Sequence, residues 1–312
     1  MSSPAAQDSS NRDWLLGFGM AVLAAVGFSA KAIFTKLAYQ EGVGAVTLLA
    51  LRMMLATPFF LAVALREVRR CPLPPLERRD QLAILILGLL GYYLSSLFDF
   101  LGLQYISAGL ERLILFLYPT FVVLLSALWF GKPFGRREAV ALTLSYTGIG
   151  VVFGGEMQSG GQQLWLGSAL VVVSTLTFSA YLIGVGETIG RIGTSRFTAY
   201  TMLVASTACL LHFVLTQPWQ DLLLSARVYQ LALGMAIFST VLPVFMLSGA
   251  IRRIGSGHSS LTGMLGPVAT LFLANRILDE QLSVAQMLGA ALVLLGVFSL
   301  SAQPLAGRFR NC

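Results

Sequence analysis

The chain has 312 residues, of which 56% are hydrophobic, 11% are charged and 31 are glycine, and its formal net charge is +7. Soluble globular domains carry roughly 25% charged residues, so lipid is the expected solvent for most of this chain. A membrane-spanning helix needs about 20 apolar residues, and ten of them would use about 200. The short loops and tails that remain exclude a separate soluble catalytic, nucleotide-binding or DNA-binding domain.

Apolar runs separated by polar breaks predict an all-α membrane protein with ten transmembrane helices. In chain order, the spans are expected at 14–35, 45–65, 82–103, 108–129, 136–153, 163–185, 196–216, 228–250, 256–275 and 283–301. Residues 1–13 form a polar tail without the apolar core of a signal peptide. Glycine and proline inside the spans predict packed and kinked helices, whose freed carbonyl groups are satisfied by neighbouring helices.

Lysine and arginine are distributed unequally between alternate ends of these spans. The poorer side carries Lys36, Arg227 and Arg276. The richer side carries Arg12, Arg66, Arg69, Arg70, Arg78, Arg79, Lys132, Arg136, Arg137, Arg191, Arg196, Arg252, Arg253, Arg308 and Arg310. Cytoplasmic loops of membrane proteins hold the excess of basic residues. Both termini are therefore expected in the cytoplasm and the protein in the inner cell membrane. The net charge is an orientation signal and indicates no nucleic-acid partner.

Catalytic and metal-binding motifs are not found in the sequence. Cys71, Cys209 and Cys312 lie far apart, which favours neither a disulfide framework nor a metal site. There is no HExxH motif, no Ser/His/Asp constellation in a loop and no cluster of metal ligands. We therefore expect no enzyme activity, no metal and no cofactor.

An internal repeat divides the chain into two halves. The pair LG at 16–17 and the triplet FSA at 28–30 both recur 150 residues later. The segment YPTFVVLL, which contains Pro119, matches GPVATLFL, which contains Pro267, at an offset of 148. Because each half has an odd number of spans, the second half enters the membrane from the opposite side. Such inverted repeats are typical of secondary transporters, whose site lies between the halves and is exposed alternately to either side.

The predicted organisation therefore has five parts. A cytoplasmic tail (1–13) precedes the first five-helix repeat (14–153), an external linker (154–162) joins it to the second repeat (163–301), and a second cytoplasmic tail (302–312) follows.

Two long segments carry a resemblance to a known family. They are LGLQYISAGLERLILFLYPTFVVLLSALWFGKPFGRREAVALTLSYTGIGVV in the first half and GHSSLTGMLGPVATLFLANRILDEQLSVAQMLGAALVLLGV in the second. With the ten spans in two inverted halves, the chain resembles the EamA family of the drug/metabolite transporter superfamily over about residues 15–301. The resemblance implies a proton- or gradient-linked carrier or a facilitator, often an exporter of amino acids or other small metabolites. It implies no particular substrate, because a fold supports many functions.

Charged residues inside the spans mark the candidate site, because they are expensive in lipid. All lie in the first half, at Lys31, Arg52, Asp99, Glu111 and Arg112. For Lys31 and Arg112, the alternative to a role in a buried site is that their long side chains reach the external lipid headgroups. Arg52 is deeper and Asp99 is shorter, which favours buried pairing for both. A cavity with these five residues has a charge of about +1, which favours a zwitterion or a small organic anion as substrate.

Polar and aromatic side chains are candidates for the cavity wall. Tyr92, Ser95, Ser96 and Asp99 recur at helical spacing and predict one polar stripe on the third span. Further candidates, which include the small residues of the ninth span, are Tyr93, Tyr118, Ser174, Thr177, Tyr181, Ser259, Gly263, Gly266 and Thr270. For the ninth span, the alternative of close helix packing is favoured.

A carrier that moves between two states and couples to protons needs proton-binding groups and hinges, and the sequence offers candidates for both. Asp99 and Glu111 are candidates for proton coupling; burial favours the neutral form of a carboxyl group and a nearby cation favours the ionised form. The sequence leaves open which effect dominates. Pro119 and Pro267 are candidate hinges, with a fixed kink as the alternative. A lone histidine among apolar neighbours is more often a packed side chain than a proton relay, so packing is the favoured role for His212.

The leading function is a secondary transporter of small polar metabolites such as amino acids, acting by alternating access as an exporter or a facilitator. A nucleotide-sugar or sugar-phosphate carrier is the alternative within transport, although the second half offers no deep cation for it. A membrane sensor, a channel or a membrane-embedded enzyme are alternatives outside that class.

Overall fold

The structure is a computed structural model that describes residues 4–70, 75–131 and 135–301. Within these ranges the chain forms helices joined by short turns, and they contain no strand. The all-α fold predicted from the hydropathy pattern is therefore confirmed.

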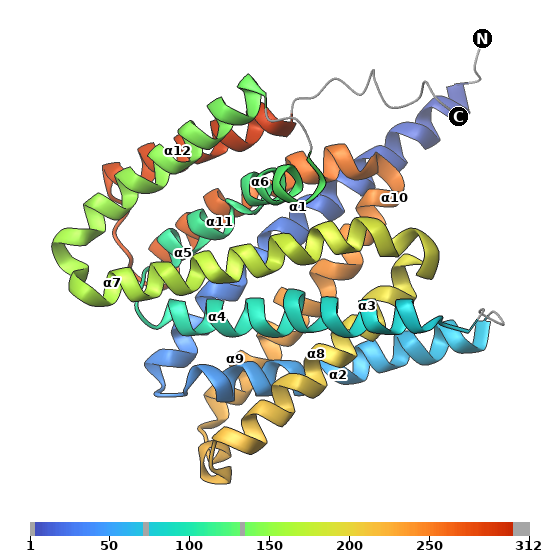
Figure 1. The fold of residues 1–312 in the computed structure, drawn as a ribbon, viewed down its shortest axis with the longest axis horizontal. Coiled ribbons are helices and arrows are strands. Elements are labelled where there is room, and N and C mark those ends of the chain that lie inside the picture. The colour runs from blue at the N-terminus through green and yellow to red at the C-terminus, as the bar shows by residue number, and fades with distance from the viewer. Residues whose placement is uncertain (1–3, 71–74, 132–134, 302–312) are drawn as a thin grey trace.

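Figure 1 shows the arrangement of the helices. The first half contains α1 (Pro4–Gln40), α2 (Ala45–Arg70), α3 (Arg78–Gly88), the π-helix η1 (Leu89–Leu94), α4 (Ser95–Leu103), α5 (Ala108–Leu115) and α6 (Tyr118–Phe130). The long element α7 (Arg136–Ile192) joins the halves. The second half continues with α8 (Thr194–Thr216), the 3-10 helix η2 (Trp219–Leu222), α9 (Ala226–Ala236), the π-helix η3 (Ile237–Val241), α10 (Leu242–Gly263), α11 (Leu265–Ile277) and α12 (Val284–Ser301).

Ten apolar helical stretches in the described residues follow the ten predicted spans in order. Eight are long and apolar enough to cross a membrane, namely Asp13–Gln40, Ala45–Arg69, Arg78–Leu103, Ala108–Phe130, Glu138–Met157, Gln162–Gly186, Thr194–Thr216 and Ala226–Ile251. The other two, Leu265–Ile277 and Val284–Ser299, are shorter apolar helices. Interrupted elements such as α3, η1 and α4 thus form one span.

The boundaries differ from the expected ones at two places. The fifth and sixth spans belong to one continuous element, α7, which Figure 1 shows turning back on itself, so that residues 154–162 are helical. The expected ninth span at 256–275 begins inside α10, which ends at Gly263, and continues as α11. Hydropathy marks where a chain is apolar, whereas the hydrogen bonds of a helix continue through a polar turn.

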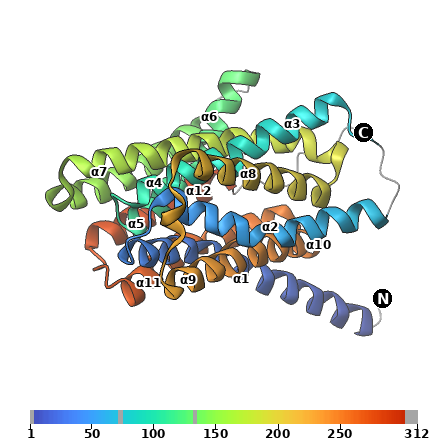
Figure 2. The same cartoon turned by 90° about the horizontal axis from the view of Figure 1, so that it is seen from below.

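The first helix of each half packs against the third helix of the other half. A Cβ atom on Gly17 of α1 would lie 2.7 Å from Ile254 Cγ2 of α10, and one on Gly167 of α7 would lie 2.7 Å from Ile106 Cγ2, next to α4. The two glycines are 150 residues apart and the two isoleucines are 148 apart. The offsets of the sequence repeat therefore reappear in the packing (Figure 2 shows α1 and α10 side by side).

The fifth helices of the two halves also pack together. A Cβ atom on Gly148 of α7 would lie 2.6 Å from the carbonyl oxygen of Gly289 in α12, and one on Gly289 would lie 2.5 Å from the carbonyl oxygen of Gly148. Farther along, Gly296 faces the carbonyl oxygen of Ala141. Contacts that move forward on one helix and backward on the other show that the two run antiparallel. Small residues allow this close approach.

Helix irregularities fall at equivalent positions in the halves. The π-helices begin at Leu89 and Ile237, and the helix breaks before α6 and α11 begin at Phe116 and Met264. Each pair is 148 residues apart. Pro119 and Pro267 each lie in the first turn after a break, where a proline removes no hydrogen bond that the helix needs. The structure places both prolines at helix breaks; their role as hinges stays a prediction.

Candidate functional site

Lys31 joins two buried carboxyl groups from different helices. Its ammonium group on α1 pairs with Asp99 of α4 and lies 3.4 Å from Glu111 Oε1 of α5. The Asp99 side chain is 2% exposed and that of Glu111 is 0% exposed. Such groups need a partner inside the protein. The structure therefore brings together three of the charged residues predicted for the site.

Local structure positions Glu111 deep in the protein. Ser107 caps α5, because its Oγ accepts a hydrogen bond from the N–H of Leu110 at 3.1 Å. Glu111 follows in the first turn of this short helix, where a negative charge is favourable near the helix N-terminus. The next residue, Arg112, points to another side of the same helix.

Arg112 extends the cluster to the second half of the chain. A Cβ atom on Gly266 of α11 would lie 2.7 Å from Arg112 Nη2, so the glycine makes room for the guanidinium group. The carbonyl group of Gly266 accepts a hydrogen bond from Ser29 Oγ of α1 at 2.8 Å. We call Lys31, Asp99, Glu111 and Arg112 the central cluster. It lies between three helices of the first half and one helix of the second.

Several polar atoms of the central cluster are buried without a hydrogen-bond partner among the described residues. They are Asp99 Oδ1, Glu111 Oε1, Glu111 Oε2 and Arg112 Nε. Thr270 Oγ1 is also unpartnered. The contact of Glu111 with Lys31 is thus an ion pair without hydrogen-bond geometry. An unsatisfied buried group costs about 1–3 kcal/mol, so a polar solute with both donors and acceptors suits this place.

Arg52 lies within electrostatic range of Asp99 but makes its direct contacts with other residues of α4. Its Nη2 donates a hydrogen bond to Ser96 Oγ at 3.0 Å, and its guanidinium carbon lies 5.0 Å from the centre of the Phe100 ring. Within the described residues, no ion pair connects it to Asp99 or Glu111. The four residues of the central cluster are thus two cations and two carboxyl groups, and Arg52 is the source of the expected excess of one positive charge.

The predicted polar stripe on the third span faces three different neighbours. Ser95 Oγ lies 3.2 Å from Ser174 Oγ of α7. Ser96 faces Arg52 on α2, and Asp99 faces Lys31 on α1. The π-helix η1 adds one residue to a turn and so shifts Tyr92 relative to the other three residues, which lie in the regular helix α4 and differ in their direction around it.

Two candidate tyrosines, Tyr118 and Tyr181, contact Phe178 of α7, and a third, Tyr92, contacts Tyr181. Tyr92 and Tyr181 place their hydroxyl oxygens 3.2 Å apart. The Phe178 ring stacks on Tyr181 at 5.7 Å and meets Tyr118 edge-on at 5.9 Å. Phe178 belongs to the repeated triplet FSA, which marks this segment as part of the internal repeat but does not predict that Phe178 packs against the tyrosines.

Other predicted wall residues are placed by local contacts. Thr177 Oγ1 donates to the carbonyl oxygen of Ser174 at 2.8 Å. Tyr93 Oη lies 3.0 Å from His212 Nδ1, so His212 is a packed side chain with a polar partner. The side chain of Ser259 lies outside the described part of the structure.

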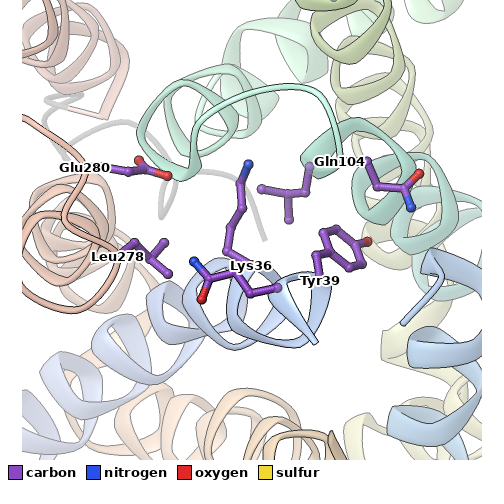
Figure 3. Close-up of a pocket in the computed structure, with 7 residues that line it drawn as sticks. Lys36, Tyr39, Gln104, Leu278 and Glu280 are labelled. Carbon is purple, nitrogen blue, oxygen red and sulfur yellow. The ribbon is translucent and has the colours of Figure 1, made fainter. Parts of the chain in front are cut away.

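A pocket that sequence reasoning missed lies beside the central cluster. Its volume is about 330 Å³. We call it the vestibule pocket; it is lined by Lys36, Tyr39, Gln40, Leu103, Gln104, Leu278 and Glu280. Figure 3 shows Lys36 reaching into the space between Glu280 and Gln104. In the sequence, Lys36 indicates only orientation, and Glu280 lies in a polar turn outside the predicted spans.

The chain is similar to known transporters along almost its whole length. A profile of the EamA-like transporter family matches residues 15–154 and 165–302. The "Uncharacterized transporter YcbK" of Bacillus subtilis (strain 168) is 29% identical over 299 residues, which cover 94% of each chain. An "S-adenosylmethionine/S-adenosylhomocysteine transporter" of Chlamydia trachomatis serovar L2 is 23% identical over 256 residues, covering 78% of this chain and 77% of the other.

A solved structure has the same fold. A crystal structure superposes with a TM-score of 0.63 at 19% identity, covering 93% of this chain and 98% of the other. The family match covers both halves of the chain, with a short gap inside α7. The resemblance seen in the sequence is therefore confirmed, and the chain belongs to the EamA-like transporter family.

Proposed function

We propose that this membrane transporter is a secondary carrier of small polar metabolites that are zwitterions or small organic anions, such as amino acids. The observation that carries the proposal is the central cluster, where Lys31, Asp99, Glu111 and Arg112 are gathered. Its opposite charges and unpartnered atoms offer sites for a carboxylate and for an ammonium group of one solute. Arg112 and Lys31 are the proposed contacts of the carboxylate, and Asp99 and Glu111 those of the ammonium group.

Alternating access fits the packing of the halves. Helices from both halves surround the central cluster, and the repeat contacts at Gly17 and Gly167 are equivalent. A rocking motion of one half against the other would expose the cluster to either side in turn. The basic residues at alternate span ends support an orientation with both termini in the cytoplasm. Tyr92, Tyr118 and Tyr181 are proposed to line the path of the solute.

Proton coupling at Asp99 and Glu111 is part of the proposal. The two carboxyl groups share one ammonium group, that of Lys31. The gain or loss of one proton there changes which ion pair forms. A solute ammonium group and a proton would compete for the same oxygens, which links their movements.

The named relatives inform the choice of ligands. S-adenosylmethionine and S-adenosylhomocysteine, which appear in the name of one relative, both carry the α-amino and α-carboxylate groups of an amino acid. They belong in the test with free amino acids.

The experiment is a thermal-shift screen of the detergent-purified protein, followed by counterflow in proteoliposomes. The ligands are amino acids, S-adenosylmethionine, S-adenosylhomocysteine, organic cations, nucleotides and sugar phosphates. A bound ligand raises the apparent stability in proportion to the logarithm of its concentration above Kd. We expect hits among the zwitterions, with thermal shifts that are smaller in Lys31→Gln and counterflow that is abolished in it. Hits among sugar phosphates alone would contradict the proposal and favour the alternative carrier class.

A further inference from the structure

The vestibule pocket has opposite charges on facing walls. Lys36 comes from α1 and Glu280 from the turn after α11. No ion pair within 4.0 Å joins these two side chains in the described part of the chain, although Lys36 lies within electrostatic range of Glu280. Figure 3 shows the space between them. A solute that carries both charges can bridge this gap.

Glu280 is held by its own backbone contacts. Its N–H donates to the carbonyl oxygen of Ala274 at 3.3 Å, and its carbonyl oxygen accepts from Asn275 Nδ2 at 3.0 Å. The preceding residue, Asp279, has a φ of 54°, which is uncommon for a residue other than glycine. The Oε1 atom of Glu280 also accepts from the N–H of Ala108 at 3.2 Å. The turn thus fixes the carboxylate in place at the pocket wall.

The pocket also offers an apolar contact and a suitable size. Leu103 and Leu278 supply apolar surface, and Gln40 and Gln104 supply amide groups. A volume of about 330 Å³ lies at the lower end of the range for small-molecule sites, which is roughly 300–1,000 Å³. This size and lining suit an amino acid with an apolar side chain of moderate length.

The vestibule pocket is connected to the central cluster through α1. Lys36 follows Lys31 by five residues, which corresponds to about 7.5 Å along a helix. Tyr39 lies in the pocket wall, and its hydroxyl group donates to the carbonyl oxygen of Phe100 at 2.6 Å. Phe100 is the neighbour of Asp99. Tyr39 and Lys36 also lie within electrostatic range of Asp99 and Glu111, respectively, which places the pocket near the central cluster.

We propose that the vestibule pocket is a second binding site, where zwitterionic solutes bind before or after they occupy the central cluster. Lys36 binds the carboxylate, Glu280 binds the ammonium group, and Leu103 and Leu278 contact the side chain. This inference rests on the proposed function for its role in transport, whereas the binding itself does not depend on transport.

The test is protection of a cysteine in the pocket wall from a neutral maleimide. Gln104→Cys is introduced after Cys71, Cys209 and Cys312 have been replaced by serine. The probes are L-methionine, 3-(methylsulfanyl)propylamine, which lacks the carboxylate, and 4-(methylsulfanyl)butanoate, which lacks the amine. We expect protection by L-methionine at the lowest concentration. Gln220→Cys, in η2 and outside the pocket, is the matched control and should stay unprotected.

Charge variants test the assigned roles. Lys36→Gln and Glu280→Gln should each raise the concentration of L-methionine that gives half protection by about tenfold, as for loss of one charged contact. Lys36→Arg should restore part of the protection. Lys31→Gln should abolish counterflow and leave the protection of Gln104→Cys unchanged, which separates this inference from the proposed transport function. Absence of protection by L-methionine, equal protection by all three probes, or protection unaffected by both charge variants would overturn the inference.

Discussion

Gly266 of α11 lies directly against the guanidinium group of Arg112 on α5, and a Cβ atom at position 266 would come within 2.7 Å of Arg112 Nη2. The contact joins the two halves of the chain next to the central cluster. The residue equivalent to Gly266 in the first half is Tyr118, which lies 148 residues earlier. The two repeats therefore have the same backbone arrangement here, but the first half has the bulky side chain of Tyr118 where the second half has Gly266, which leaves room for Arg112.

The first prediction concerns this contact. Gly266→Ala should destabilise the protein by about 1–3 kcal/mol, the usual cost of an added methyl group in a tightly packed place. It should also weaken solute binding, because Arg112 must move. Thermal unfolding in detergent gives the first quantity and ligand-induced thermal shifts give the second. Gly263→Ala is the control, because a Cβ atom there meets no other atom within 4 Å. Equal effects of both variants would contradict the assigned contact.

A second prediction tests the role of Asp99. Asp99→Asn should keep the fold and reduce solute transport and its coupling to protons, because the amide cannot exchange a proton near neutral pH. Uptake and internal pH are measured together in proteoliposomes. Asp80→Asn is the matched control on the same span, since Asp80 Oδ1 pairs with Arg191 Nη2 at 3.0 Å, away from the cluster. Unchanged uptake and coupling in Asp99→Asn would rule out this role.

A third prediction measures how Lys31 and Asp99 depend on each other. Lys31→Gln leaves two buried carboxyl groups without their ammonium partner and should cost about 3–5 kcal/mol. The double variant Lys31→Gln/Asp99→Asn removes one of the stranded charges, so its loss should be smaller than the sum of the single losses. A double-mutant cycle from chemical or thermal unfolding gives the coupling energy. Additive losses would show that the pair is not coupled.

The structure also shows how far sequence reasoning reaches. Lys31, Asp99 and Glu111 were identifiable because ionised groups are rare in lipid-facing sequence, whatever their partners. The depth of Arg52 along its span predicts the same site, but depth carries no information on the direction of the side chain, which depends on how α2 packs against α4. Hydropathy found the ten spans for a similar reason, since it depends on composition and not on contacts.

Two features of the structure had weaker signals in the sequence. Helical spacing places Tyr92 on the same stripe as Asp99 only if the helix has 3.6 residues per turn throughout, and no residue type in the sequence indicates the wider turn of η1 that contains Tyr92. Lys36 and Glu280 line the same pocket only because the C-terminal end of α1 lies near the turn after α11. A charged residue at a span end is ordinarily solvated, so neither could be assigned to a pocket before the fold was known.

The last prediction uses the packing symmetry of the halves. Gly17→Ala and Gly167→Ala each push a methyl group against an isoleucine at 2.7 Å, Ile254 in one case and Ile106 in the other. Both variants should lower the unfolding free energy by a similar amount, about 1–3 kcal/mol. Gly19→Ala and Gly186→Ala are the controls, since a Cβ atom at either position meets nothing within 4 Å. These controls should be neutral or slightly stabilising, because alanine is the better helix former. If Gly17→Ala were destabilising and Gly167→Ala were neutral, the two interfaces would not be equivalent, and a rocking motion shared equally by the halves would lose its structural basis.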